Sequence, residues 1–399
     1  MVESRTDIAV IGAGPAGLIA AREAAKTGVA VTVFEEHQEI GVPCHCAGLL
    51  SLKGLREIRV PVDQSFVQNR LKGAHFFSPS RLSITVERDE PVACVVDRPR
   101  FDRFLAERTM RAGADLRLDS KVKDLKRLDG EILLAGDFGT MKADIVVDAE
   151  GLASHLIKQI GLQPLPVKRL LPAIQYDLKG VDVDQDHVEV HMGRKLAPGF
   201  FAWIIPLDEN AARVGLACEG DNPYQRLRRF IEDRFDGESN LDRVHTRSGF
   251  IITHGPVPRS FHDNFIAIGD VAGQVKPTTG GGVIWGGICA MIAGRVAAEA
   301  IEARSFTKGF FGNYETLWRK RLEREIRFTL LARKIANRLS DETVDKVFKS
   351  VTESDLQEEL SMDGDIDFQA RAILNVARKK DILKILLSSA SDLIGYLRQ

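Results

Sequence analysis

The sequence predicts an α/β protein with an inserted antiparallel sheet and a helical C-terminal region. Three patterns among the 399 residues indicate this architecture. A glycine-rich turn joins an apolar strand to an alanine-rich helix near the N-terminus. Short segments of alternating polarity fill the middle of the chain, which is typical of hairpin-connected strands. After about Phe306, apolar residues recur at spacings of three and four, which indicates helices.

The N-terminal turn has the composition and the setting of a dinucleotide-binding motif, which makes this domain Rossmann-like. Residues 7–11 are predicted to form a buried strand, 16–26 a helix and 29–34 a second, parallel strand. In such a turn Gly12 permits the sharp bend, and Gly14 lets a pyrophosphate approach the backbone. We expect the dinucleotide to contact Gly12, Gly14, Pro15, Ala16 and Gly17.

The end of the second strand indicates which dinucleotide fits. Glu35 closes this strand and is followed by Glu36. A carboxylate here accepts hydrogen bonds from a ribose and disfavours a 2′-phosphate, so FAD or NAD fits better than NADP. Because the helix N-terminus also offers free N–H groups to phosphates, a glycine turn without a ligand is the weaker interpretation.

Composition bounds the function classes and the compartment. The formal net charge of −1 gives no general drive toward nucleic acid. The five cysteines are odd in number and scattered, which favours a reducing compartment over a disulfide framework. Because no signal-peptide pattern precedes the first strand, we expect a cytoplasmic protein. The apolar stretch 283–298 is glycine-rich and contains Arg295, so it falls short of a membrane span and is predicted to be a buried helix.

The chain is long for a single core and is predicted to divide into three parts. The boundaries are 1–72, 97–165 and 259–305 for the dinucleotide-binding domain, 73–96 and 166–258 for an inserted substrate-binding sheet domain, and 306–399 for the helical C-terminal region. Within the last part, residues 317–339 are strongly basic. This indicates either a solvated helix face or a surface that contacts anionic headgroups or an acidic partner.

A second glycine-rich segment late in the chain completes the expected cofactor site. An apolar strand over residues 265–268 runs into Asp270, and a loop then leads to Gly281 and Gly282 at the start of a helix. Asp270 can hold a ribityl hydroxyl, and the glycines let the chain pass close to a flat ring. The helix N-terminus can stabilise negative charge on a reduced flavin. The segment therefore favours FAD as the cofactor.

Together these two segments resemble those of the large family of FAD enzymes with the glutathione-reductase-type fold, in its branch without a separate nicotinamide domain. The resemblance implies two further contacts with the cofactor. Residues 97–102 match the segment in which an arginine of that family reaches the FAD, which implies Arg98. The turn over residues 148–151, which continues to Ser154, resembles the family's turn near the adenosine half.

Two further stretches resemble the geranylgeranyl reductase family. Pro43 and Cys46 match a P-x-x-C segment of that family, and residues 198–217 match a Y-x-W-x-F-P…G-x-G stretch. That stretch keeps Trp203, Pro206 and Gly215, and it departs from the pattern at Phe201, Ile205 and Ala217. The resemblance implies an FAD-dependent reductase that saturates isolated double bonds of geranylgeranyl chains, in precursors of archaeal-type membrane lipids.

The resemblance also implies roles for individual residues. Cys46, with Ala47 and Gly48, is expected in the loop that crosses the reactive face of the flavin. Hydride addition to an isolated alkene also needs a proton on the adjacent carbon, so Cys46, or a water that it positions, is the candidate donor. A buried, inert cysteine is the alternative. The prenyl chain is expected to contact Phe200, Phe201, Trp203, Ile205, Pro206 and Gly215, of which only one alternating set can face a cavity.

Other functions stay open at this point. An FAD-dependent monooxygenase or halogenase acting on an aromatic substrate would share the FAD motifs, and a non-catalytic flavin electron-transfer protein would need no channel beside the flavin. Cys44, His45 and Cys46 offer too few well-spaced ligands for a metal, so none is expected. The expected partners are a prenyl lipid and an electron donor, either ferredoxin or NAD(P)H, but no nucleic acid. Peripheral contact with a membrane stays open.

Overall fold

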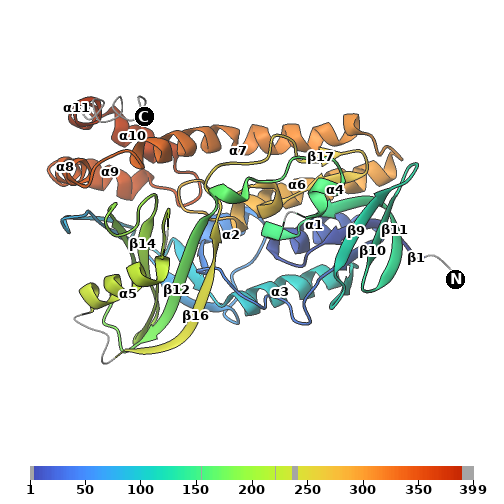
Figure 1. Cartoon of the computed structure of the whole chain (residues 1–399), viewed down its shortest axis with the longest axis horizontal. Coiled ribbons are helices and arrows are strands. Elements are labelled where there is room, and N and C mark those ends of the chain that lie inside the picture. Colours follow the sequence, from blue (N-terminus) through green and yellow to red (C-terminus); the bar gives the residue numbers. More distant parts are fainter. Residues whose placement is uncertain (1–3, 154, 221, 236–240, 389–399) are drawn as a thin grey trace.

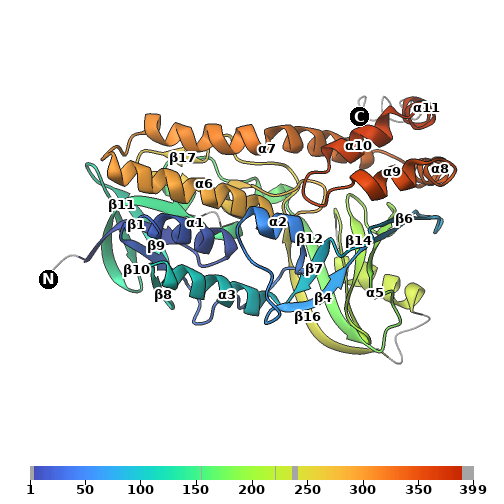
Figure 2. The same cartoon turned by 180° about the vertical axis from the view of Figure 1, so that it is seen from behind.

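The computed structural model is elongated, with one sheet at each end and a long helix running past both (Figures 1 and 2). It describes residues 4–153, 155–220, 222–235 and 241–388. The expectations for Ser154 and for residues 389–399 lie outside the described residues.

The N-terminal sheet has the strand order β17-β18-β11-β1-β2-β8, and the hairpin β9–β10 extends from β11. Its strands are β1 (Ser4–Ile11), β2 (Val31–Phe34), β8 (Asp115–Arg117), β9 (Val122–Arg127), β10 (Ile132–Gly136), β11 (Gly139–Asp148), β17 (Phe261–His262) and β18 (Phe265–Ala267). Neighbouring strands in the series β18-β11-β1-β2-β8 run parallel, as the buried β-branched runs predict. The predicted strand–helix–strand unit is therefore confirmed.

Helices cover both faces of this sheet. On one face α1 (Pro15–Ala25), α3 (Arg98–Arg111) and α6 (Val283–Glu302) share a core with the inward residues Ile8 and Val10 of β1. On the other face the short α4 (Leu156–Gln159) and the β9–β10 hairpin cover Ala9 and Ile11. The parallel strands thus end together at one edge, where the glycine-rich turn lies.

The second sheet has the order β16-β12-β15-β14-β13-β5-β6. Its strands are β5 (Gly73–Phe77), β6 (Ser83–Glu87), β12 (Leu171–Lys179), β13 (His187–Met192), β14 (Phe201–Asp208), β15 (Ala211–Ala217) and β16 (Asp242–Ile251). The pairing is antiparallel, as predicted, except that β13 and β5 run parallel. Helix α5 (Pro223–Arg234), which the sequence analysis did not predict, covers its outer face through Leu227, Phe230 and Ile231.

A small third sheet joins the two parts. In it β7 (Ala93–Val96) lies between β3 (Leu49–Ser51) and β4 (Val67–Leu71). The expected inserted block 73–96 therefore divides: its first two strands enter the large sheet, whereas β7 does not. The reason is burial, since all four residues of β7 are buried and its backbone is paired on both sides. The domain boundaries themselves stay a prediction.

The C-terminal region is helical, as predicted. Its helices are α7 (Lys308–Ala336), α8 (Asp341–Thr352), α9 (Leu356–Asp363), α10 (Ala370–Arg378) and α11 (Lys380–Ser388). Figure 2 shows α7 lying above α6 and running toward the second sheet, with the shorter helices above that sheet. A cluster around Ile84 of β6 and Phe348 of α8 packs the short helices onto that sheet.

Helix α6 is buried, as predicted, although one part of the argument was wrong. Its length and its mean hydropathy of 1.4 do reach the range of a membrane-spanning helix. However, 78% of its most apolar window is buried inside the protein, where Trp285 and the small residues of α6 pack against α1. Helix α6 is therefore a core element that packs with α1 and the N-terminal sheet.

Buried hydrogen bonds fasten α7 to the loop after β18. The Tyr314 hydroxyl donates to the carbonyl oxygen of Ala267 at 3.1 Å and accepts from the Gln274 amide at 2.7 Å. The Gln274 carbonyl oxygen in turn accepts from the backbone N–H of Gly269 at 2.9 Å. Tyr314 and Gln274 are fully buried, so each of these groups depends on the others for its hydrogen bonds.

We expect Tyr314→Phe to destabilise the protein by about 1–3 kcal/mol, because it leaves the buried Gln274 amide without its acceptor. Denaturant unfolding followed by circular dichroism would measure the change. Tyr224→Phe is the matched control, since Tyr224 is 48% exposed and lies at the surface. Equal midpoints for the two variants would contradict the assignment.

Candidate functional site: a dinucleotide cradle beside a cysteine loop

The turn between β1 and α1 is shaped by its glycines. Gly12 has a φ of +96°, and a Cβ on Gly17 would lie 1.9 Å from the carbonyl oxygen of Gly12. Both positions therefore require glycine for the turn itself. Gly14 differs, because a Cβ there would meet no atom of the described residues within 4 Å. Its backbone faces open space at the N-terminus of α1, where Pro15 and Ala16 begin the helix.

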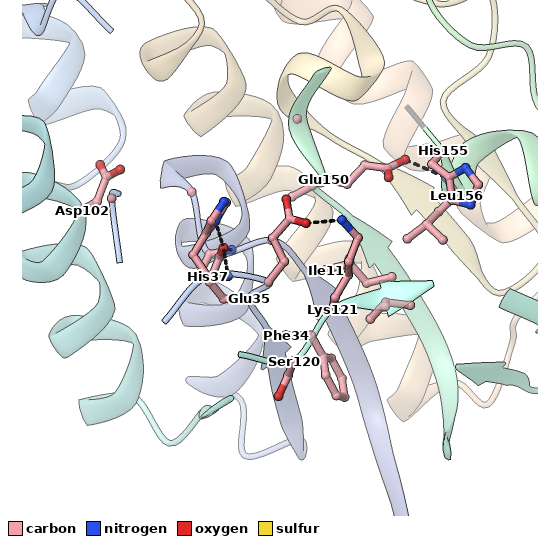
Figure 3. A pocket seen from close by; sticks show the side chains of 18 of the residues that line it. Ile11, Phe34, Glu35, His37, Asp102, Ser120, Lys121, Glu150, His155 and Leu156 are labelled. Carbon is pink, nitrogen blue, oxygen red and sulfur yellow. Dashed lines mark hydrogen bonds and ion pairs between the residues drawn. The ribbon is translucent and has the colours of Figure 1, made fainter. Parts of the chain in front are cut away.

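A cavity of about 540 Å³ opens beside this turn (Figure 3). Glu35 lines it and is held in place: its carboxylate accepts from the backbone N–H of Ala13 at 2.8 Å and from the His37 backbone N–H at 3.0 Å. Glu36 also lines the cavity and pairs with Lys121. Gly12, Gly14 and both acids thus surround one cavity, as the sequence predicts.

The turn after β11 forms the opposite wall of the cavity, as Figure 3 shows for Glu150. The Glu150 carboxylate accepts from the backbone N–H of Leu156 at 2.8 Å, which fixes the start of α4. Asp148 lies beneath, fully buried, and burial together with the nearby Glu150 raises the pKa of Asp148 well above its usual value. The Asp148 carboxyl group accepts from the backbone N–H of Glu150 at 3.1 Å and so supports the same turn.

Asp270 lies in the short helix η3 (Gly269–Ala272), beside the N-terminus of α6. Gly282 is the N-cap of α6, and a Cβ on it would lie 2.7 Å from the Asp270 carboxylate. A Cβ on Gly281 would similarly meet Lys276. Burial raises the pKa of Asp270, and the charge of Arg98 partly offsets this. The structure thus brings the late glycines, Asp270 and Arg98 together.

Arg98 connects Asp270 to the cysteine loop. From the first turn of α3 it makes a two-pronged ion pair with Asp102, at 3.1 and 3.0 Å. Burial opposes its charge, but Asp102, with the thiols of Cys46 and Cys44, raises the pKa of Arg98. The predicted arginine therefore lies among the groups that the sequence analysis assigned to the cofactor.

The loop that carries Cys46 is tied to the third sheet. Cys46 is half-buried, and its sulfur accepts from the backbone N–H of Gly48 at 3.4 Å. The carbonyl oxygen of Gly48 accepts from Val96 of β7 at 2.8 Å. Cys44 is also half-buried, and burial raises the pKa of its thiol. The backbone of the loop is therefore fixed around Cys46.

The sequence analysis missed the polar side chains that hold this loop from the second sheet. Gln175 of β12 donates to the carbonyl oxygen of His45 at 3.1 Å, and Arg213 of β15 donates to that of Ala47 at 2.7 Å. Arg213 is also paired in two-pronged fashion with Asp177, at 2.7 and 3.0 Å. The sequence did carry a signal for Arg213, because a charged residue inside an apolar strand needs a buried partner.

The residues of β14 that were predicted to contact the prenyl chain divide between the two faces of this strand. Ala202 and Ile204 pack under α5, whereas Phe201, Trp203 and Ile205 face the third sheet and the cysteine loop. Pro206 follows the first set by strand alternation. Phe200 precedes β14 and stacks on Phe201, with ring centroids 4.1 Å apart.

Gly215 has a steric reason in this arrangement. A Cβ there would lie 2.6 Å from the Trp203 ring and from the Gln175 side chain, so the flat indole lies directly on the backbone of β15. The indole N–H of Trp203 and the side-chain carbonyl oxygen of Gln175 are buried and have no hydrogen-bond partner among the described residues. Two unsatisfied polar atoms therefore lie beside the cysteine loop.

Comparison with known proteins agrees with this geometry. A family model described as lycopene cyclase protein matches residues 7–360. The chain is 34% identical to digeranylgeranylglycerophospholipid reductase 2 of Methanothermobacter thermautotrophicus, over 88% of this chain and 92% of that protein. It is 30% identical to digeranylgeranylglycerophospholipid reductase of Methanocaldococcus jannaschii, over 95% of this chain and 96% of that one.

Solved structures show the same fold. A geranylgeranyl bacteriochlorophyll reductase-like protein from Thermoplasma acidophilum has a TM-score of 0.88 at 28% identity, covering 98% of this chain and 100% of that one. A halogenase, PltM, solved in complex with FAD, has a TM-score of 0.70 at 13% identity, covering 98% and 96%, and shows the fold alone. With most of its length matched by these relatives, the chain belongs to the geranylgeranyl reductase family and has an FAD-binding fold.

Proposed function

We propose that this chain is an FAD-dependent reductase that saturates isolated double bonds of geranylgeranyl chains in precursors of archaeal-type membrane lipids. One observation carries the proposal: the Cys46 loop lies beside the Asp270–Arg98 side of the cofactor cradle and beside the apolar Trp203 face. The relatives named as digeranylgeranylglycerophospholipid reductases support the substrate. A monooxygenase or halogenase shares only the fold, at 13% identity for PltM.

The residues present fit FAD. Gly14 leaves open space for a pyrophosphate at a helix N-terminus, and Glu35 is held where a ribose can donate to it. Asp270 offers a carboxylate beside the N-terminus of α6, where a ribityl hydroxyl would be held. We interpret the fold as the glutathione-reductase type, which the pairing of the Gly12 turn with the Asp270 segment supports.

The mechanism follows from what an isolated alkene needs. When bound and reduced, FAD supplies a hydride. The adjacent carbon needs a proton, and Cys46 is the group in this loop that can hold one, directly or through a water. Arg98 fixes charge next to the Cys46 sulfur, while Phe201 and Trp203 present an apolar surface that excludes bulk water. The electron donor in this proposal is ferredoxin or NAD(P)H.

The open space at Gly14 gives a direct test of the cradle. Because a Cβ there meets no described atom, Gly14→Ala is expected to leave the melting temperature of the flavin-free protein unchanged but to lose most of its bound FAD, measured as flavin absorbance per chain. The exposed Gly309→Ala in α7 is the matched control and is expected to keep its FAD. Full flavin content in Gly14→Ala would place the pyrophosphate elsewhere.

The role of Cys46 is tested against its neighbour Cys44. With dithionite-reduced enzyme and a digeranylgeranylglycerophospholipid, Cys46→Ala is expected to lower the rate of double-bond saturation on the order of 10²-fold. Cys44→Ala, in the same loop, is expected to keep the rate. Product masses and flavin content would be measured for each variant. Unchanged rates in both Cys46→Ala and Cys46→Ser would remove Cys46 from the mechanism.

We further propose that α7 rests on an anionic membrane surface, which would make the enzyme a cytoplasmic protein with peripheral membrane contact. A groove of about 810 Å³ runs along this helix. Leu317 and Leu331 are 47% and 53% exposed on its outer side, and Lys320 and Arg324 lie between them at helical spacing. Exposed leucines flanked by cations suit the boundary between acyl chains and anionic headgroups.

Vesicle sedimentation tests this surface. Lys320→Glu/Arg324→Glu is expected to lower binding to anionic vesicles by about tenfold or more, since each cation contributes about 1 kcal/mol near such a surface. The control, Lys126→Glu/Lys158→Glu, makes the same change of net charge at exposed sites far from α7 in sequence. Undiminished binding in the α7 variant, or equal losses in both variants, would overturn the proposal.

A further inference from the structure

A histidine pair and an aspartate meet where β5 and β13 run parallel. His75 lies in β5, His187 begins β13, and Asp184 lies in the loop just before it. The Asp184 Oδ2 atom is 3.1 Å from His75 Nε2 and 2.9 Å from His187 Nδ1. The two imidazoles stack, with centroids 4.4 Å apart. One carboxylate oxygen and two ring nitrogens therefore converge within 4.8 Å of one another.

Hydrogen bonds fix further atoms of Asp184 and His75. The Asp184 Oδ1 atom accepts from the backbone N–H of Asp186 at 2.9 Å, so only Oδ2 faces the imidazoles. On the far side of the rings, His75 Nδ1 is hydrogen-bonded to Thr85 Oγ1 at 2.9 Å, whereas His187 Nε2 is buried without a hydrogen-bond partner among the described residues and lies 3.7 Å from Glu87 Oε2. The oxygen behind the His75 ring is the kind of contact that orients metal-ligating histidines and makes them more basic.

Burial and charge suit a cation with one open position. The side chains of His187, His75 and Asp184 are 9%, 24% and 44% exposed, so one side of the cluster is open to water. Despite the opposing effect of burial, hydrogen bonds from His75, Asp186 and His187 keep the pKa of Asp184 below its usual value. The cluster therefore presents one carboxylate oxygen and two imidazole nitrogens close together, with one side open to water.

We propose that His75, Asp184 and His187 form a binding site for a divalent transition-metal ion such as Zn²⁺, with water as the fourth ligand. Two imidazoles and one carboxylate are a ligand set that Zn²⁺ accepts, and hard Ca²⁺ or Mg²⁺ would prefer oxygens alone. The site is separate from Cys44, His45 and Cys46, whose spacing speaks against a metal. It lies outside the proposed reaction.

The ion has a structural role in this position. It cross-links β5, with its hairpin partner β6, to the loop before β13. These segments are about a hundred residues apart in sequence, and the parallel pairing of β5 with β13 holds them together in this part of the large sheet. Bound metal would therefore stabilise the end of the second sheet against opening of that pair.

Zinc titration of the full-length, chelator-treated flavoprotein tests the proposal. In competition with a chromophoric chelator, the wild type is expected to bind one Zn²⁺ per chain, and its melting temperature is expected to rise on binding. His75→Gln and Asp184→Asn each remove a ligand at a partly exposed position and are expected to weaken binding roughly tenfold or more. Both variants are expected to retain FAD, which reports that they are folded.

Two controls make the result specific. His245→Gln changes an exposed histidine of β16 and is expected to leave zinc affinity unchanged. Cys44→Ser/Cys46→Ser removes the other cluster of soft ligands and is likewise expected to bind zinc normally. The proposal is overturned if zinc fails to saturate at one ion per chain, if His75→Gln and Asp184→Asn bind as the wild type does, or if only the cysteine variant loses binding.

Discussion

The buried ion pair between Arg213 and Asp177 is the constraint on which the arrangement of the site depends. Arg213 is 4% exposed, and its guanidinium donates hydrogen bonds to two partners, the Asp177 carboxylate and the carbonyl oxygen of Ala47. Arg247 completes the charge around the same carboxylate at 2.6 Å. Because an unpaired buried charge costs several kcal/mol, Arg213 and Asp177 stay paired. This pairing holds the guanidinium of Arg213 where it donates to the Cys46 loop. The loop is thereby fixed relative to both the apolar β14 face and the cofactor cradle.

A comparable connection comes from the C-terminal region. Asp367, in the linker between α9 and α10, is 2% exposed; it pairs with Lys276 at 2.8 Å, accepts from Ser51 and receives the Trp285 indole N–H on its carbonyl oxygen. Lys276 belongs to the loop that ends in Gly281 and Gly282. The helices beyond α7 therefore reach back to the loop before α6 and help to shape the late glycine segment. This gives the helical region a role in positioning the site.

Several features could be predicted because their causes are local. The bend at Gly12, the close packing at Gly17 and the acid at Glu35 each follow from neighbouring residues and from strand periodicity. What the sequence did not predict was non-local: β7 pairs in a third sheet with β3 and β4 and not in the large sheet with β5 and β6. The division of Trp203 and Pro206 between opposite faces of β14, in contrast, follows from strand alternation, and only the pairing of strands decides which face meets the cysteine loop. Which individual residues contact FAD or lipid stays a prediction.

By itself the sequence determined the Rossmann-like unit, the second glycine segment, the family and the helical C-terminal region, since turn stereochemistry and apolar periodicity depend on residues that are close in sequence. Only the tertiary structure decided how the cysteine loop is held and that His75, Asp184 and His187 meet. Gln175 and Arg213 lie more than a hundred residues from the loop that they hold, and His75 lies 109 residues from Asp184. Contacts of that range depend on which strands pair, and no local pattern in a single sequence specifies that choice.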